Sequence, residues 1–135
     1  MAAAAPAAGT EWTVNQCVLE SSRQPVSDGY QQTTVHFAVT PRSVALVSAA
    51  PLDVTGSDIE LKVDKEAFVP IDRLEGDRTA LFDSSYERVV EQFKAGTQVK
   101  VQLRFWPTWP ATGTHTTTLS LIGFTRAYGE LASCR

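Results

Sequence analysis

The sequence predicts a mostly β, sandwich-like fold with one helix in the middle of the chain and a short helix near its end. Apolar and polar side chains alternate along most of the chain, which is the period of a strand that buries one face. Pro, Gly and Asp residues divide these runs into short strands. Apolar residues take helical spacing at about 84–95 and about 124–133. We therefore expect one domain over residues 11–135.

The first half of the chain contains most of the predicted strands. Alternation begins with a strand over residues 12–19 and returns over 34–39. Shorter apolar runs follow at 44–48 and 59–63, each set off by proline or by a Gly-containing cluster, and residues 66–71 are expected to be extended. This half is therefore expected to contain no helix.

The middle helix has the clearest predicted boundaries. Ser84 and Glu87 stand at the spacing of a capping box, in which each side chain bonds to the backbone N–H of the other. Gly96 offers a left-handed stop at the far end. Beyond it, residues 99–105 and 114–121 alternate on either side of a Pro- and Gly-containing loop, which predicts a long hairpin.

The two cysteines, Cys17 and Cys134, stand near opposite ends of the chain. A disulfide between them would close nearly the whole domain into one loop, which the chain-entropy model values at roughly 4 to 5 kcal/mol. The alternative is a pair of buried free thiols in a reducing compartment. With only two histidines besides, and no zinc-finger spacing, no metal site is expected.

Residues 1–10 form an Ala-rich segment with one proline. The segment lacks the basic start and long apolar stretch of a signal peptide, but it is typical of sequence just after a cleavage site. We expect a disordered remnant of an exported protein. The net charge of -3 and the lack of a Lys/Arg cluster argue against nucleic acid or an anionic membrane as partner. No apolar run is long enough for a transmembrane helix.

Two motifs in the last third of the chain resemble those of a known family. They consist of Lys94, Ala95 and Gly96, and of Ser120, Leu121, Gly123, Phe124 and Ala127. With the surrounding stretches, residues 86–105 and 119–131, they are similar to the invasion-associated locus B family. The resemblance implies a small, exported, β-rich bacterial protein associated with host-cell invasion or the cell envelope, without an assigned catalytic centre. The chain departs from the family by lacking mid-chain cysteines and by inserting residues 106–113.

The inserted loop holds the candidate binding residues Trp106, Pro107, Trp109 and Pro110. Two indole rings in a proline-stiffened loop lose little entropy on binding and offer flat apolar faces to a partner. The alternative is that these rings fold back and cap one end of the sandwich.

Catalytic and cofactor motifs are missing from the sequence. His36 and His115 lie in alternating runs, where a structural role is the default, and no nucleophile elbow, phosphate-binding loop or dinucleotide fingerprint accompanies them. Four acidic residues surround a Gly-containing turn but lack the spacing of a calcium loop, namely Asp72, Glu75, Asp77 and Asp83. We therefore expect no catalytic residue, no cofactor and no metal.

These observations favour a non-catalytic protein, periplasmic or secreted by a Gram-negative bacterium, that binds a protein or an envelope component. One alternative is a periplasmic inhibitor that plugs a secreted hydrolase with residues 106–110. A third possibility is an envelope glycan hydrolase, which would need two carboxylates facing each other across a cleft.

Overall fold

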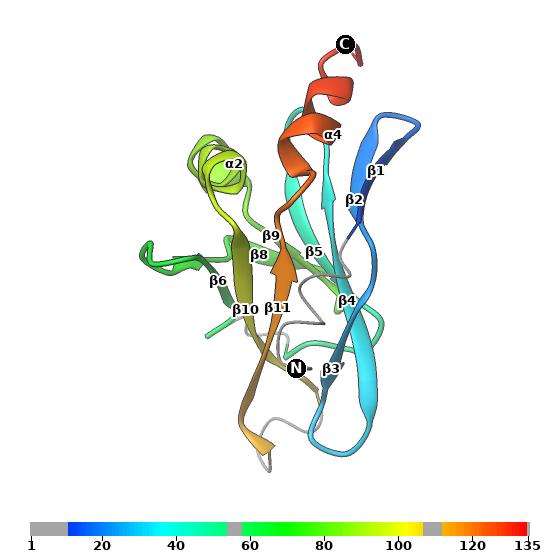
Figure 1. The fold of residues 1–135 in the computed structure, drawn as a ribbon. Coiled ribbons are helices and arrows are strands. Elements are labelled where there is room, and N and C mark those ends of the chain that lie inside the picture. The colour runs from blue at the N-terminus through cyan, green and yellow to red at the C-terminus, as the bar shows by residue number, and fades with distance from the viewer. Residues whose placement is uncertain (1–10, 54–57, 107–111, 135) are drawn as a thin grey trace.

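The computed structural model describes residues 11–53, 58–106 and 112–134, and its course is drawn in Figure 1. Two antiparallel sheets pack face to face, and two helices lie at one end of the sandwich (Figure 1). The predicted mostly β fold with a mid-chain and a C-terminal helix is confirmed. The Ala-rich segment, residues 1–10, lies outside the described residues.

The larger sheet has seven strands in the order β1-β2-β4-β5-β9-β8, with β3 also paired to β4. These strands are β1 (Trp12–Asn15), β2 (Val18–Ser21), β3 (Gln24–Ser27), β4 (Gln32–Val39), β5 (Val44–Ser48), β8 (Arg73–Glu75) and β9 (Thr79–Leu81). Both β2 and β3 pair with the same edge of β4. Between their ladders the Ser21 hydroxyl accepts a hydrogen bond from the Phe37 N–H at 2.9 Å, so a side chain replaces a missing backbone acceptor.

The smaller sheet has four strands in the order β11-β10-β6-β7. These strands are β6 (Glu60–Val63), β7 (Val69–Pro70), β10 (Gln98–Arg104) and β11 (Thr114–Ser120). The predicted long hairpin is confirmed, since β10 and β11 pair along their whole length, from Gln98 opposite Ser120 to Arg104 opposite Thr114.

The prediction of one strand over residues 12–19 is wrong, because that segment is the hairpin of β1 and β2. Its two turn residues, Gln16 and Cys17, have φ angles of 54° and 65°. Two-residue hairpin turns need positive φ and are usually built from Gly or Asn. A turn of two residues shifts the inward positions by one, here from Trp12 and Val14 to Leu19 and Ser21, but the consecutive apolar residues Val18 and Leu19 hide that shift in the sequence.

Both predicted helices are present, with shifted ends. A single 3₁₀ turn, η2 (Asp83–Ser85), leads into α2 (Tyr86–Ala95), and the closing helix is α4 (Phe124–Leu131). The predicted capping box is wrong, because no side chain caps the start of α2. Ser84 instead donates both its hydroxyl and its N–H to the carboxylate of Asp72. That carboxylate ties η2 to the segment before β8.

Two glycines at the helix boundaries have different roles. Gly96 was expected to be left-handed, but its φ is -91° and the expectation is wrong. It is required by space, because a Cβ there would collide with Val63 and lie 2.9 Å from the Gln92 carbonyl oxygen. Gly123 has a φ of 94°, a conformation that other residues adopt only at a cost, and it turns the chain from β11 into α4.

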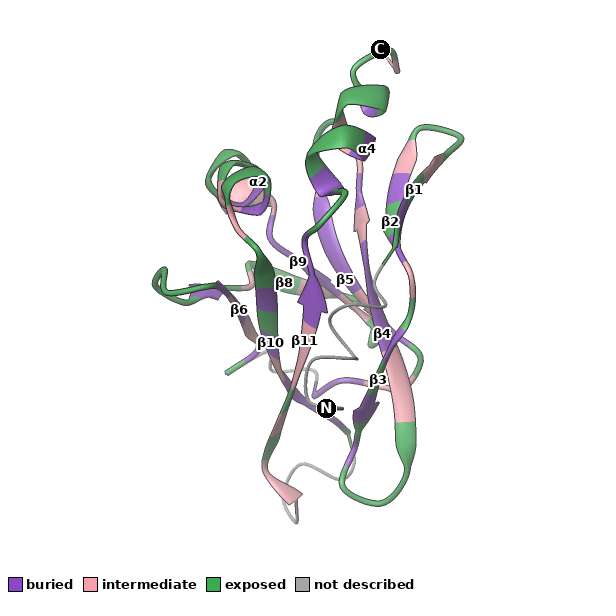
Figure 2. Cartoon of the chain, viewed as in Figure 1, coloured by how far each residue is buried: buried purple, intermediate pink, exposed green. Residues whose placement is uncertain are grey.

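The core lies between the sheets and continues under the two helices, and Figure 2 shows buried residues on the strands of both sheets and on α2 and α4. At the helical end, Trp12, Phe37, Phe93 and Phe124 form an aromatic cluster with ring centroids 5.2 to 6.4 Å apart. The Trp12 indole N–H donates to the Ser120 carbonyl at 2.8 Å, which links the first strand to the last.

The predicted disulfide is confirmed in this geometry. Cys17 and Cys134 are bonded, with their Cα atoms 5.6 Å apart. The bond joins the turn between β1 and β2 to the segment after α4. Within the described part of the chain, the helices are too short or too polar to cross a membrane.

Candidate functional site

Of the four candidate binding residues, the structure describes Trp106. Its side chain is 54% exposed, whereas the preceding Phe105 is only 1% exposed. Pro107, Trp109 and Pro110 lie outside the described residues. Trp106 therefore stands in solvent directly beyond a residue that is fixed in the core.

The backbone beneath Trp106 is held by a short extension of β10. The Trp106 N–H donates to the Pro51 carbonyl at 3.0 Å, and Phe105 forms an isolated bridge with Leu52. One residue further back, the Asp53 N–H donates to the Arg104 carbonyl at 2.8 Å. Residues 51–53 thus fix the direction in which the chain leaves the sheet.

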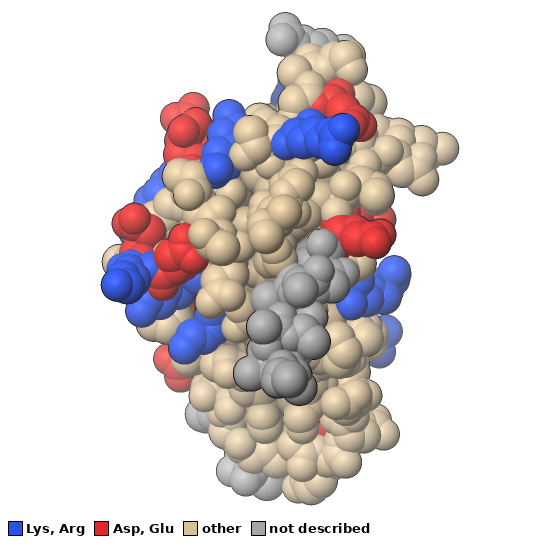
Figure 3. All heavy atoms as spheres, viewed as in Figure 1, with Lys and Arg blue, Asp and Glu red and all other residues tan. Residues whose placement is uncertain are grey.

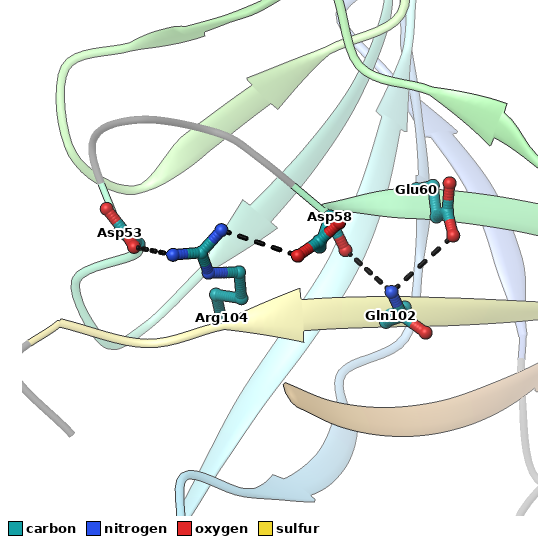
Figure 4. Close-up of polar contacts among 5 residues, drawn as sticks. All are labelled: Asp53, Asp58, Glu60, Gln102 and Arg104. Atoms are coloured by element: carbon teal, nitrogen blue, oxygen red, sulfur yellow. Dashed lines mark hydrogen bonds and ion pairs between the residues drawn. The ribbon is translucent and has the colours of Figure 1, made fainter. Parts of the chain in front are cut away.

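A buried ion pair reinforces the same place (Figure 4). Arg104 Nη2 lies 2.7 Å from Asp53 Oδ2, and the two side chains are 9% and 7% exposed. Arg104 Nη1 lies 3.5 Å from Asp58 Oδ2, and Gln102 Nε2 donates to the Asp58 carbonyl at 2.9 Å. One arginine thus holds the residues on both sides of positions 54–57.

This cluster was not predicted from the sequence. Arg104 occupies an outward-facing position in the alternation of β10, where a solvated charge is expected. Its burial comes from the segment around Asp53, which is distant in sequence. The nearest signal was the pair Asp53 and Asp58 on either side of a turn-forming cluster, and that pattern does not name a partner.

A second exposed aromatic ring, Tyr30, stands in the turn between β3 and β4, and it is 72% exposed. The turn is closed by Asp28, whose carboxylate accepts the N–H groups of Tyr30 and Gln31, each at 2.9 Å. The hydrogen bonds from Gln31 and then Tyr30 lower the pKa of Asp28, so the carboxylate stays ionised and satisfied.

The Tyr30 turn and the Trp106 strand belong to the same end of the sandwich. Thr112 Oγ1 donates to the Asp28 carbonyl at 3.3 Å and lies 3.0 Å from His115 Nε2. The His115 ring in turn lies 6.0 Å from the ring of Phe105. We call the surface formed by residues 28–31, Trp106 and residues 112–115 the loop end.

The loop end carries almost no exposed formal charge. Residues 105–125 contain no Asp, Glu, Lys or Arg, and residues 24–41 contain only Asp28, which is 7% exposed. In Figure 3 charged side chains lie over the upper and middle parts of the visible face, on the side of α2 and β6, near α4 and along the right-hand edge, whereas the lower end is nearly all uncharged. Two exposed aromatic rings therefore stand on a neutral surface.

The two histidines lie apart from each other in different sheets. His36 is 9% exposed, and its Nε2 lies 4.0 Å from Glu20. Burial, and secondarily Arg23, lowers its pKa. His115 is bonded to Thr112 at the loop end. Neither histidine has a described hydrogen bond to a serine or cysteine that it could activate.

Three carboxylates, those of Asp53, Asp58 and Glu60, belong to the cluster around Arg104, and within the described residues Glu60 forms no ion pair with that arginine. Burial and the neighbouring Asp58 raise the pKa of Glu60, and its Oε2 lies 3.5 Å from Gln102 Nε2. In the described ranges, no three His, Cys, Asp or Glu side chains are placed to hold a metal ion.

No family model, curated protein or solved structure matches the chain. The resemblance to the invasion-associated locus B family therefore stays a prediction based on two motifs. The structure gives several residues of those motifs a part in the fold. Gly96 leaves room for Val63, Gly123 makes a left-handed turn, and Phe124 is fully buried.

Proposed function

We propose that the chain is an exported, non-catalytic bacterial protein that binds a protein partner through its loop end. The exposure of Trp106 carries this proposal. The indole is 54% exposed, yet the backbone that bears it is hydrogen-bonded to Pro51 and adjoins the buried pair of Arg104 and Asp53. A large apolar ring on a fixed base loses little conformational freedom on binding, which is the property of an interface anchor.

The surroundings of Trp106 favour a protein partner over a charged polymer. Interface cores are depleted in charged residues and enriched in aromatic ones. Tyr30 supplies a second exposed ring, and the one carboxylate of its turn, Asp28, is already bonded to backbone N–H groups. Docking on this surface would therefore bury little unpaired charge, so its desolvation cost would be small.

Export is supported by the disulfide between Cys17 and Cys134, because such bonds persist in oxidising compartments. The resemblance to the invasion-associated locus B family supports a periplasmic or secreted protein of a Gram-negative bacterium, and a role at the envelope or in host-cell invasion. A partner that is an envelope component other than a protein would contact the same two exposed rings, Trp106 and Tyr30.

A periplasmic inhibitor of a secreted hydrolase is the second candidate, because it would use the same protruding surface. A glycan hydrolase is the third. The carboxylates it would need lie around Arg104, but two of them, Asp53 and Asp58, form ion pairs with that arginine. This arrangement favours a structural role for the cluster.

The test compares three single variants of the immobilised protein. Trp106→Ala and Tyr30→Ala each remove one ring of the loop end, and Ile122→Ala removes a side chain that is 73% exposed near α4 and serves as the control. A partner identified from envelope extract is then titrated against each variant by calorimetry. We expect each loop-end variant to weaken binding about tenfold or more, and the control to bind as the wild type does.

Equal affinity of all three variants for that partner would refute the proposed surface. If the partner is a hydrolase whose activity falls on binding, the chain is an inhibitor rather than a binding protein of another kind. Release of sugar from purified envelope glycan by the protein alone would contradict a non-catalytic role.

A further inference from the structure

A groove lies between α4 and the turn that joins β4 to β5. In Figure 1, α4 stands at the end of the sandwich opposite the loop end. One wall is the turn between β4 and β5, residues 40–42, and the other is formed by Tyr128, Leu131, Ala132 and Cys134. The groove encloses about 740 Å³, within the range of sites for small molecules. Its volume suits a compact ligand better than a protein partner.

The walls of the groove are mainly apolar and are held in place. Leu131 is only 2% exposed, and Cys134 is fixed by the disulfide to Cys17. The Tyr128 ring stacks on Phe124 at 5.6 Å. These contacts preform an apolar surface, so a ligand would not have to order it.

The tyrosine hydroxyls have no hydrogen to offer a ligand. Tyr86 donates its single hydrogen to the Thr40 carbonyl at 2.9 Å. Tyr128 must then donate to Tyr86, whose oxygen lies 2.8 Å away. The groove therefore presents a hydroxyl acceptor, and a donor to an anion must come from elsewhere.

That donor is Arg42. Among the described residues that line the groove it is the one charged residue, and its guanidinium has no ion pair with any of the described residues. The nearby carboxylate of Asp83 accepts hydrogen bonds from Ser43 and from the Val44 N–H. A second cation, Lys94, lies 4.7 Å from the centre of the Tyr128 ring. Lys94 is paired with Glu91, whose Oε2 lies 3.8 Å from its Nζ, and Asp83 and Glu87 line the adjacent hollow. Within the described residues, Arg42 is therefore the cation of the groove without an ion pair.

We propose that this groove binds a small amphipathic monoanion, namely a carboxylate with an aliphatic or aromatic body. The body lies against Leu131, Ala132 and the disulfide, and the carboxylate pairs with Arg42. A guanidinium at the rim and an apolar floor together match this ligand class, whereas a neutral apolar molecule would leave the arginine unused.

Two fluorescent probes that differ by one charge test the assignment. Anilinonaphthalene sulfonate carries an anionic group, and phenylnaphthylamine is the same aromatic body without it. We expect saturable binding of the sulfonate to the wild-type protein and its displacement by decanoate but not by decanol. Arg42→Gln should lower the affinity for the sulfonate about tenfold and leave the affinity for the neutral probe nearly unchanged.

Two further variants distinguish the groove from other sites. Ala132→Phe adds a ring at an exposed position and should lower the affinity for both probes, because the ring fills part of the groove. Circular dichroism checks that this variant keeps the fold. Arg88→Gln removes a charge that lines only the adjacent hollow and should change neither probe.

Unchanged sulfonate affinity in both Arg42→Gln and Ala132→Phe would overturn the proposal, as would failure of decanoate to displace it. If Arg42→Gln lost the same affinity for the neutral probe as for the sulfonate, the assigned role of the charge would be overturned. Trp106→Ala should leave both probes unaffected, so this proposal and the proposed function can fail separately.

Discussion

Replacing Arg104 by methionine should destabilise the fold strongly, because it removes one member of a buried ion pair and leaves the other in place. The Arg104 and Asp53 side chains are 9% and 7% exposed, and their closest nitrogen and oxygen atoms are 2.7 Å apart. Removing one partner of such a pair costs about 3 to 5 kcal/mol. For a chain of this length the melting temperature should fall by roughly 10 to 20 °C, measurable by circular dichroism or calorimetry.

Two control variants decide whether the uncompensated charge is the cause. Asp58→Asn removes a carboxylate that is 61% exposed and 3.5 Å from Arg104, so it should cost at most about 1 kcal/mol. The double variant Arg104→Met with Asp53→Leu removes both buried charges and should be less destabilised than Arg104→Met alone. A loss below about 1 kcal/mol for Arg104→Met, or a double variant as unstable as the sum of its parts, would refute this reasoning.

Three further outcomes are expected. Mass spectrometry of unreduced protein should show the loss of two hydrogens at Cys17 and Cys134, and reduction should lower the free energy of unfolding by up to about 5 kcal/mol in denaturant titrations. Two free thiols in protein from its native compartment would contradict both the bond and export. Trp106→Ala should leave the melting temperature nearly unchanged because the residue is 54% exposed, whereas Trp12→Ala, at 9% exposure, should lower the free energy of unfolding by roughly 3 to 5 kcal/mol. Similar losses of stability in the two variants would show that the Trp106 ring is packed. Because the pKa of His36 is lowered in the folded state, its contribution to stability is complete above about pH 7 and declines as the pH falls through about 6.5, the pKa of the unfolded state. His36→Gln should flatten this part of the plot of stability against pH. An unchanged plot would exclude this histidine as the cause.

Local patterns were sufficient to predict most of the strands, both helices and the disulfide. Alternation of apolar and polar residues shows which face of a strand is buried. In a chain with only two cysteines, each has one possible intramolecular partner. The turn at Gln16 and Cys17 was not predicted because its residues are unusual for positive φ and because the adjacent apolar residues Val18 and Leu19 hide the one-residue shift of the alternation. Gly96 was given the wrong role because its need for space arises from Val63, on a different element.

The candidate sites were less predictable because each combines segments that are far apart in sequence. The Trp106 loop was singled out by its composition, but the buried pair beneath it joins Arg104 to Asp53 across the outward face of a sheet. The groove beside Arg42 exists only because α4 packs next to the turn between β4 and β5. Neither arrangement leaves a periodic signal in the chain.

The disulfide also determines how the molecule would carry a mechanical load. A partner pulling on the loop end would pull along β11, whose hydrogen bonds to β10 run across the strand and would share the force in shear. The force would pass through α4 to Cys134 and then, by a covalent bond, to the turn at Cys17. The last helix could not peel away from the first hairpin without breaking that bond. In an oxidising compartment the fold would therefore resist extension at the end where α4 meets the first hairpin.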